Sequence, residues 1–185
     1  MLVLTGGTAS GKTTICKELI KLGMEKIVTV TTRPMRDGEI EGDDYFFVSD
    51  EEFEQMKKDN KFIETAEYNT AYGIWKYGTL YSNIKENGVI ILNPNGIINL
   101  VKKDIDCSIF LIQTPISIIK RRLIQRGDSP EEYMRRISTD SKDFNSFFIS
   151  AYVDYLIFND ESKTVENIAH DIYELYKNNN EEEEM

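Results

Sequence analysis

Short continuous apolar runs alternate along the chain with longer stretches in which apolar residues recur every three or four positions. The runs Leu2–Thr5, 89–92 and Ser108–Gln113 have the length of strands and lack polar alternation, which is typical of strands covered on both faces. The longer stretches have the period of amphipathic helices. Because the two kinds of segment alternate, the sequence predicts an α/β fold, with a mostly parallel sheet flanked by helices.

Capping and turn residues place the other elements. Ser49 and Glu52 form a capping-box pattern, which opens a short helix. Thr114 is expected to cap a further helix, with Pro115 at its first position. We also expect helices over residues 12–22, after Ser129 and along the apolar face of Val165, Ile168, Ala169, Ile172, Leu175 and Tyr176. The remaining expectations are strands at 26–31 and 152–158, strand or loop at 61–68 and 72–79, and a loop at 33–44.

The chain is long enough for one compact domain, and it is acidic. Its 185 residues carry a formal charge of −10, which argues against nucleic acid as the main partner, because phosphate backbones bind to basic surfaces. Part of this charge lies in residues 178–185, which are expected to form a disordered acidic tail. No apolar run approaches the roughly 20 residues of a membrane helix, and no signal peptide is expected before the first motif. We therefore expect a cytoplasmic protein without a membrane partner.

Residues 6–13, G-G-T-A-S-G-K-T, match the phosphate-binding pattern G-x-x-x-x-G-K-[ST] between an expected strand and an expected helix. Glycines let the backbone N–H groups turn inward, and the N-terminus of the helix adds partial positive charge. Lys12 adds a full charge for the β- and γ-phosphates of a nucleotide, and the Thr13 hydroxyl can bind Mg²⁺. The predicted ATP-binding residues are Gly6, Gly7, Thr8, Ala9, Ser10, Gly11, Lys12, Thr13 and Thr14.

On its own, this motif indicates a site for nucleotide phosphates and leaves the class of protein open. A chance glycine-rich turn is the alternative without function, and GTPases and ATPase motors share the motif. The chain leaves little room for motor subdomains, and it has no N-K-x-D guanine motif, since Asn159-Asp160 lacks the lysine. These features favour a kinase, in which phosphoryl transfer depends on positioning and charge and needs no histidine or cysteine nucleophile.

The segment 33–44 concentrates arginine, glycine and acidic residues in a predicted loop. Arg33 and Arg36, followed by Tyr45, can hold a phosphate group through forked hydrogen bonds. The alternative is a solvated loop, in which the two arginines only offset the charge of neighbouring carboxylates. The spacing of the arginines alone does not decide between these interpretations.

Residues 31–48, T-T-R-P-M-R-D-G-E-I-E-G-D-D-Y-F-F-V, resemble the guanylate kinase family, whose pattern T-T-R-x-x-R-x-G-E-x-x-G-x-D-Y-x-F-V they match throughout. The resemblance extends from the phosphate loop to the last helix. It implies a P-loop NTPase-type core over residues 1–31 and 80–185, an inserted GMP-binding subdomain over 32–79 and a small lid around 127–136. It also implies that MgATP donates its γ-phosphoryl group to GMP or dGMP, and we expect a monomer or a weak homodimer.

The resemblance assigns roles to single residues. Its lid-side arginines match Arg122 and Arg126, which lie four apart on a predicted helix and so project from one face, and then either Arg136 or Arg135. The alternative for this helix is a basic surface without function. The residues expected in catalysis are Lys12, Arg122 and Arg136, and Arg126 is expected to bind ATP. The residues expected to bind the acceptor are Thr29, Arg33, Arg36, Tyr45, Glu64, Tyr77, Thr79 and Asn95.

One departure from the family pattern lies between Glu64 and the Tyr-Gly-Thr element at residues 77–79. This element is several residues further from Glu64 than usual, so we favour Tyr77 and Thr79 and interpret 69–76 as an insertion. The closer alternative, Tyr72 and the glycine after it, lacks the hydroxyl residue. Trp75, inside the insertion, either fills an apolar gap or stacks near the substrate.

A second departure is that Asn93 and Asn95 fall where the family has acidic residues, one of which accepts hydrogen bonds from guanine. Hydrogen bonds to charged groups contribute roughly 1.5–3 kcal/mol, against about 1 kcal/mol for neutral ones. Weaker GMP binding or a relaxed base preference would follow. Two alternatives therefore stay open: a kinase of the same fold for another nucleoside monophosphate or a phosphorylated sugar, and a non-catalytic binding module. The intact loop around Lys12 argues against the module.

Overall fold

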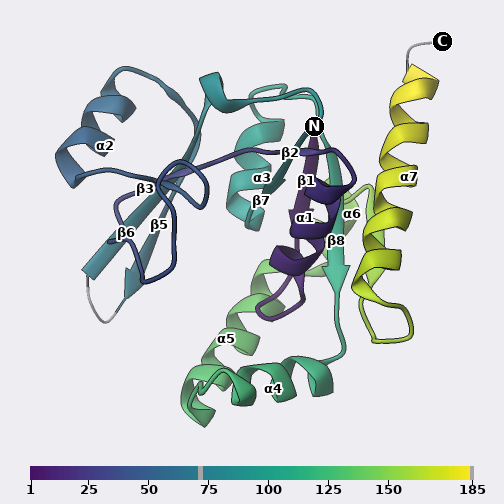
Figure 1. Cartoon of the computed structure of the whole chain (residues 1–185). Coiled ribbons are helices and arrows are strands. Elements are labelled where there is room, and N and C mark those ends of the chain that lie inside the picture. Colours follow the sequence, from purple (N-terminus) through teal and green to yellow (C-terminus); the bar gives the residue numbers. More distant parts are fainter. Residues whose placement is uncertain (71–72, 184–185) are drawn as a thin grey trace.

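The computed structural model describes residues 1–70 and 73–183 and shows a layered α/β core with a smaller lobe beside it (Figure 1). The core sheet is parallel, as predicted, with the strand order β2-β7-β1-β8-β9. Its strands are β1 (Leu2–Thr5), β2 (Glu25–Lys26), β7 (Gly88–Ile91), β8 (Ser108–Gln113) and β9 (Tyr155–Phe158).

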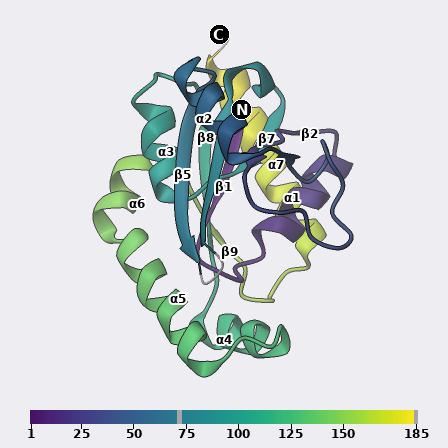
Figure 2. The ribbon, with the colours of Figure 1, turned by 90° about the vertical axis from the view of Figure 1, so that its left-hand side faces the viewer.

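Helices cover both faces of the core sheet (Figures 1 and 2). The helices α1 (Lys12–Lys21) and α7 (Val165–Glu183) lie on one face, and α3 (Pro94–Val101) and α6 (Ser146–Tyr152) lie on the other. Successive residues of β1 serve the two faces, because Leu2 and Leu4 pack with α1 and α7 whereas Val3 packs with α3 and α6. Burial on both faces explains why the strands are continuous apolar runs. None of the described helices combines the length and the apolar character needed to cross a bilayer.

The smaller lobe contains a second sheet, with the strand order β4-β3-β6-β5, and the helix α2. Phe53 of α2 stacks on Phe62 of β5, with 4.5 Å between the ring centroids. The predicted capping box is confirmed, because Ser49 Oγ accepts from Glu52 N at 3.1 Å and Glu52 Oε2 accepts from Ser49 N at 2.8 Å. The elements are β3 (Val30–Thr31), β4 (Phe46–Phe47), α2 (Asp50–Lys58), β5 (Phe62–Thr70) and β6 (Gly73–Leu80), followed by the 3-10 helix η1 (Tyr81–Asn83).

Two further helices, α4 (Ile116–Gln125) and α5 (Pro130–Asp143), form an arm beyond the end of β8 (Figure 1). Ser129 caps α5 as predicted, and its Oγ accepts from Glu132 N at 3.3 Å. The prediction that Thr114 caps α4 is wrong. Pro115 is the N-cap, and the buried Thr114 hydroxyl instead donates to the carbonyl of Ser10 at 3.0 Å, where it supports the phosphate loop.

The strand predicted at 26–31 is in fact divided between the two sheets. Ile27 packs in the core, whereas Val30 packs in the lobe with α2. The chain therefore leaves the core sheet after β2 and enters the other sheet at β3. A continuous β-branched run does not reveal such a crossing, since both ends of the run are buried.

Two expectations for the C-terminal part also need correction. The strand predicted at 152–158 begins only at Tyr155, because a further helix, α6, occupies the residues up to Tyr152. Asn145 caps this helix, and its Oδ1 accepts a hydrogen bond from Phe148 N at 3.0 Å. The tail predicted to be disordered from residue 178 continues α7 to Glu183. Neither glycine nor proline interrupts this segment, and glutamate is a good helix former. Residues 184 and 185 lie outside the described range.

Candidate active site

The loop between β1 and α1 is wrapped around the ammonium group of Lys12. Lys12 Nζ donates to the carbonyls of Gly6 at 2.8 Å and Gly7 at 2.7 Å. Gly6 and Gly11 have φ angles of 146° and 100°, and a side chain at Gly6 would place its Cβ 2.4 Å from the carbonyl oxygen of Ile112. Glycine is therefore required at Gly6 both by the backbone angle and by the lack of space.

Side chains from three other segments hold this loop from outside. The carbonyl of Ser10 accepts from Thr114 Oγ1 at 3.0 Å and from Asn159 Nδ2 at 2.8 Å. The carbonyl of Ala9 accepts from Arg122 Nη1 at 3.0 Å. Thr114 and Asn159 are buried and follow the ends of β8 and β9, which meet at the same edge of the sheet. Sequence reasoning gave neither residue a place in the site, although both are polar residues directly after predicted buried strands.

The charge state of Lys12 depends on its surroundings. Burial lowers the pKa of Lys12 to about 8, Asp140 acts in the opposite direction, and the nearby positive charge of Arg126 lowers it further. Thr13 and Thr14 are exposed in the first turn of α1. A glycine-rich turn, a helix N-terminus and a cation in one loop form a cradle for an anionic group such as a phosphate.

Arg136, in the middle of α5, lies against this loop. Arg136 forms ion pairs with Glu132 at 2.8 Å and Asp128 at 3.2 Å, and its Nη1 lies 3.5 Å from Thr8 Oγ1. Arg135 instead forms a two-pronged pair with Glu132, at 2.7 and 2.8 Å, and its side chain is exposed. Of the two arginines that the sequence left as alternatives, Arg136 is the one that contacts the phosphate loop.

The two arginines of α4 are placed differently. Arg122 is half-buried and reaches the loop through the carbonyl of Ala9, while its other terminal nitrogen lies 3.5 Å from Glu161. Arg126 follows the last residue of α4 and is exposed, but it is near enough to Lys12 to affect its pKa. Arg122 thus supports the loop, and Arg126 adds positive charge beside it.

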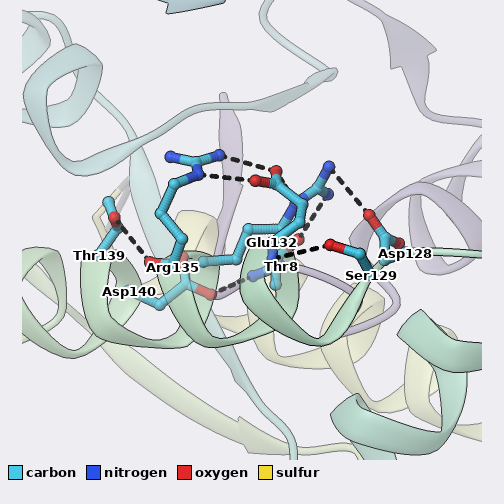
Figure 3. A network of polar contacts seen from close by, with 8 residues as sticks. Thr8, Asp128, Ser129, Glu132, Arg135, Thr139 and Asp140 are labelled. Atoms are coloured by element: carbon cyan, nitrogen blue, oxygen red, sulfur yellow. Dashed lines mark hydrogen bonds and ion pairs between the residues drawn. The ribbon is translucent and has the colours of Figure 1, made fainter.

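Asp140 of α5 is a contact of the loop that sequence reasoning missed. Its Oδ2 accepts from the backbone N–H of Thr8 at 2.7 Å (Figure 3). Burial raises the pKa of the Asp140 carboxyl, whereas the Thr8 hydrogen bond and the charge of Lys12 act in the opposite direction. The only indication in the sequence is that Asp140 lies four residues after Arg136, on the same face of the helix.

A second cationic cradle lies in the smaller lobe and is formed around Arg33. This side chain is only 3% exposed and lies over the rings of Tyr45 and Phe47, at 5.4 and 5.6 Å from their centroids. Its Nη2 donates to Glu39 Oε1 at 2.6 Å. Although burial acts in the opposite direction, hydrogen bonds with Glu39 and Tyr77 raise the pKa of Arg33, which stays charged.

An aromatic cluster continues from this arginine. The ring of Tyr77 makes edge contacts with Tyr45 at 5.9 Å and Tyr68 at 5.4 Å. Tyr77 therefore joins Arg33 and Tyr45 in one place, and Tyr72, the other tyrosine considered, lies outside the described residues. Arg36 is exposed in the same loop, and its backbone N–H donates to Glu39 Oε2 at 2.7 Å.

Glu64 and Thr79 face one another across the hairpin of β5 and β6. Thr79 Oγ1 donates to Glu64 Oε1 at 2.6 Å, and both side chains are buried. Burial raises the pKa of Glu64 above its ordinary value. A Cβ added at Gly96 would lie 3.3 Å from Glu64 Oε2, so this oxygen lies beside the N-terminal turn of α3. Thr29 is half-buried in the crossing between the two sheets, where its carbonyl accepts from Phe46 N at 2.9 Å.

The two asparagines at the start of α3 have different surroundings. Asn93 is the N-cap, and its Oδ1 accepts from Gly96 N at 2.8 Å while its Nδ2 donates to the hydroxyl of Tyr68. The second hydrogen bond ties the β5-β6 hairpin to the core. Asn95 is exposed in the first turn of the helix. Asn93 thus has a structural role at the start of α3, which its position in the family pattern did not indicate.

Fold and site together define a class: the chain is an α/β protein with a P-loop for nucleotide phosphates and a second, arginine-based cradle in a separate lobe. The family model named guanylate kinase matches residues 1–178. Guanylate kinase of Clostridium tetani is 36% identical over 167 residues, covering 87% of this chain and 78% of that protein. Guanylate kinase of Caldanaerobacter subterraneus is 33% identical over 177 residues, covering 91% and 84%.

A solved structure gives the same result. The crystal structure of guanylate kinase from Anaplasma phagocytophilum superposes with a TM-score of 0.70 at 25% identity, covering 97% of this chain and 85% of that chain. The chain belongs to the guanylate kinase family, which confirms the resemblance found in the sequence, and its activity is that of a nucleoside monophosphate kinase, a phosphotransferase. These comparisons give no support to the alternatives of a different acceptor or a binding module.

Proposed function

We propose that the chain transfers the γ-phosphoryl group of MgATP to GMP or dGMP. The observation that carries this proposal is the pair of cationic cradles, one around Lys12 in the core and one around Arg33 in the lobe. Two separate anion sites suit a reaction between two phosphate-bearing substrates. The relatives compared above, each a guanylate kinase by name, support GMP as the acceptor.

On the donor side, the loop of residues 6–13 would bind the phosphates of ATP. Lys12 would exchange its carbonyl partners for phosphate oxygens, and the N-terminus of α1 would add its partial positive charge. Mg²⁺ would arrive on the ATP phosphates, because it usually keeps several waters and is bound through substrate phosphates and one or two protein ligands. The exposed hydroxyl of Thr13 would be its protein ligand, and the bound ion would neutralise phosphate charge.

On the acceptor side, Arg33, Arg36, Tyr45 and Tyr77 would hold the phosphate of GMP. Arg33 is oriented in advance by two rings, so little side-chain entropy remains to be lost on binding. Its ion pair with Glu39 would open, because the phosphate offers a stronger forked partner.

The base would lie near the hairpin and the start of α3. Guanine presents N–H donors on one edge, and Glu64 Oε2 is a carboxylate oxygen beside Gly96 that can accept from them. Thr79 holds the other oxygen of that carboxylate. Asn95 and Thr29 would supply further polar contacts without charge.

Transfer itself needs charge neutralisation and exclusion of water rather than a covalent intermediate. Lys12, Arg122 and Arg136 would stabilise the developing charge on the transferred group, and Arg126 would add positive charge near the ATP. Closure of the arm around residues 127–136 would exclude water from the site. A cytoplasmic location and a monomeric or weakly dimeric state stay predictions from the sequence.

An acceptor panel tests the proposal. Coupled-assay turnover with MgATP is measured for GMP, dGMP, AMP, CMP and UMP, and we expect a clear preference for the two guanine nucleotides. Lys12→Ala should abolish turnover, whereas Lys17→Ala, an exposed lysine on the same helix, should leave it unchanged. A preference for AMP or a pyrimidine nucleotide would refute guanine as the acceptor base.

A further inference from the structure

The carboxylate of Asp140 lies directly on the phosphate loop. Its Oδ2 accepts from Thr8 N at 2.7 Å, and a Cβ added at Gly7 would come within 2.9 Å of the same oxygen (Figure 3). The side chain makes no other hydrogen bond or ion pair in the described part of the chain. The one polar contact of this carboxylate is thus to a loop N–H of the kind that receives phosphate.

A whole face of α5 rests on the loop, and Asp140 is part of it. Tyr133 and Ile137 pack against Ala9 and against Leu123 of α4, and Arg136 lies 3.5 Å from the Thr8 hydroxyl. Residues 133, 136, 137 and 140 have the spacing of one helix face. Asp140 is held on the loop by the same packing that holds the helix there.

A carboxylate and a phosphate oxygen use the same donors. Both accept hydrogen bonds from loop N–H groups, and both are attracted by Lys12, whose pKa is affected by Asp140 in this structure. The two anions also repel each other, so a nucleotide phosphate cannot enter beside the Asp140 carboxylate without a large electrostatic cost. One anion must leave before the other binds.

We propose that Asp140 is an internal competitor for the donor-phosphate site, which holds α5 on the phosphate loop and must be displaced when a nucleotide binds. This inference rests on the proposed function in that it takes residues 6–13 as the nucleotide site. It adds an autoinhibitory contact: part of the binding energy of the nucleotide is spent on releasing α5. The release of Asp140 also frees the helix that carries Arg136 to move relative to the loop.

Calorimetric titration of the full chain with ADP, without any acceptor, tests the proposal. Asp140→Ala removes the competitor, so ADP should bind about tenfold more tightly than to the unchanged chain, the scale of one charge-assisted hydrogen bond. Asp140→Asn keeps the shape of the side chain and an acceptor oxygen but no charge, so its affinity should lie between the two. Asp143→Ala, an exposed carboxylate one turn later on α5, should leave the affinity unchanged.

Equal or weaker ADP binding by Asp140→Ala would overturn the proposal. If circular dichroism shows that Asp140→Ala does not fold, the ADP affinity of the nearly isosteric Asp140→Asn is the test. Tighter binding than that of the unchanged chain supports the proposal, and equal or weaker binding overturns it. Steady-state kinetics gives a second readout, since the KM for ATP should fall while the KM for GMP does not change. The two proposals can fail separately: ADP binding without turnover on GMP contradicts only the proposed function, and turnover on GMP without tighter ADP binding contradicts only the competitor.

Discussion

The hydroxyl of Thr79 donates a 2.6 Å hydrogen bond to Oε1 of Glu64, and the two side chains are 0% and 6% exposed. This bond fixes the orientation of a buried carboxylate in the cross-strand pair of β5 and β6. Its other oxygen lies beside Gly96, where a larger residue would crowd it. A buried carboxylate held by one oxygen is suited to accept hydrogen bonds from a ligand with the other.

Glu64→Gln should weaken binding of GMP more than it slows transfer. The amide keeps the shape of the side chain but loses its charge, so we expect the KM for GMP to rise about tenfold with a smaller change in kcat. Glu67→Gln, an exposed carboxylate on the same strand, is the control and should leave the KM unchanged. Equal KM values for the two variants would show that Glu64 does not contact the base.

The pKa of Glu64 gives the same assignment a pH dependence. Burial raises this pKa above its ordinary value, so the carboxylate takes up a proton at a higher pH than an exposed glutamate would. A protonated Glu64 has lost its charge and is a weaker acceptor for the N–H groups of guanine. The KM for GMP should therefore increase as the pH falls through the raised pKa, and Glu64→Gln should lose this dependence. An unchanged pH profile in the variant would contradict the assignment.

Those parts of the fold and site that depend on local sequence could be predicted. The loop around Lys12, the capping box at Ser49 and the buried strands each follow from a few neighbouring residues, because glycine angles, end-of-helix hydrogen bonds and apolar runs are local properties. The pairing of Arg33 with the aromatic rings was partly predictable, since the arginine and Tyr45 belong to one motif.

The contacts that depend on tertiary packing were not predictable in this way. Asn159 and Thr114 support the loop only because β8 and β9 end beside it. Asp140 reaches Thr8 across a sequence separation of 132 residues, and its spacing of four residues from Arg136 does not by itself predict this contact. The division of residues 26–31 between two sheets likewise depends on which partners each half finds, and these partners are remote in sequence.

Arg33→Ala should remove the main contact with the acceptor phosphate. The lost charge-assisted hydrogen bonds correspond to an increase of about 100-fold in the KM for GMP, while the KM for ATP should change little. Arg121→Ala, an exposed arginine on α4, serves as the matched control. Because Arg33 is buried and paired with Glu39, the melting temperature is measured in parallel. A GMP dependence identical to that of the unchanged chain would show that the clamp is wrongly assigned.

Arg136 and Arg135 are neighbours in sequence, but they should differ strongly in their effect on turnover. Arg136 approaches Thr8 of the loop, whereas Arg135 pairs with Glu132 at the exposed side of α5. We expect Arg136→Ala to reduce kcat by about 100-fold or more, as for other groups that neutralise charge on a transferred phosphoryl group. Arg135→Ala should stay within about twofold of the unchanged chain, since an exposed ion pair contributes little. If Arg135→Ala reduced kcat more than Arg136→Ala, Arg135 and not Arg136 would be the residue that acts on the transferred group.

Loss of the proton from Lys12 should lower the kcat/KM for ATP at alkaline pH. Burial lowers its pKa to about 8, so the ammonium form, which attracts phosphate, is lost as the pH rises through this value. The kcat/KM for ATP reports groups of the free enzyme and should therefore fall above about pH 8. Bound phosphate favours the charged lysine and raises its pKa, so kcat/KM for GMP, measured with saturating ATP, should remain level to a higher pH. If both profiles fall together, or neither falls, the group that titrates is not Lys12.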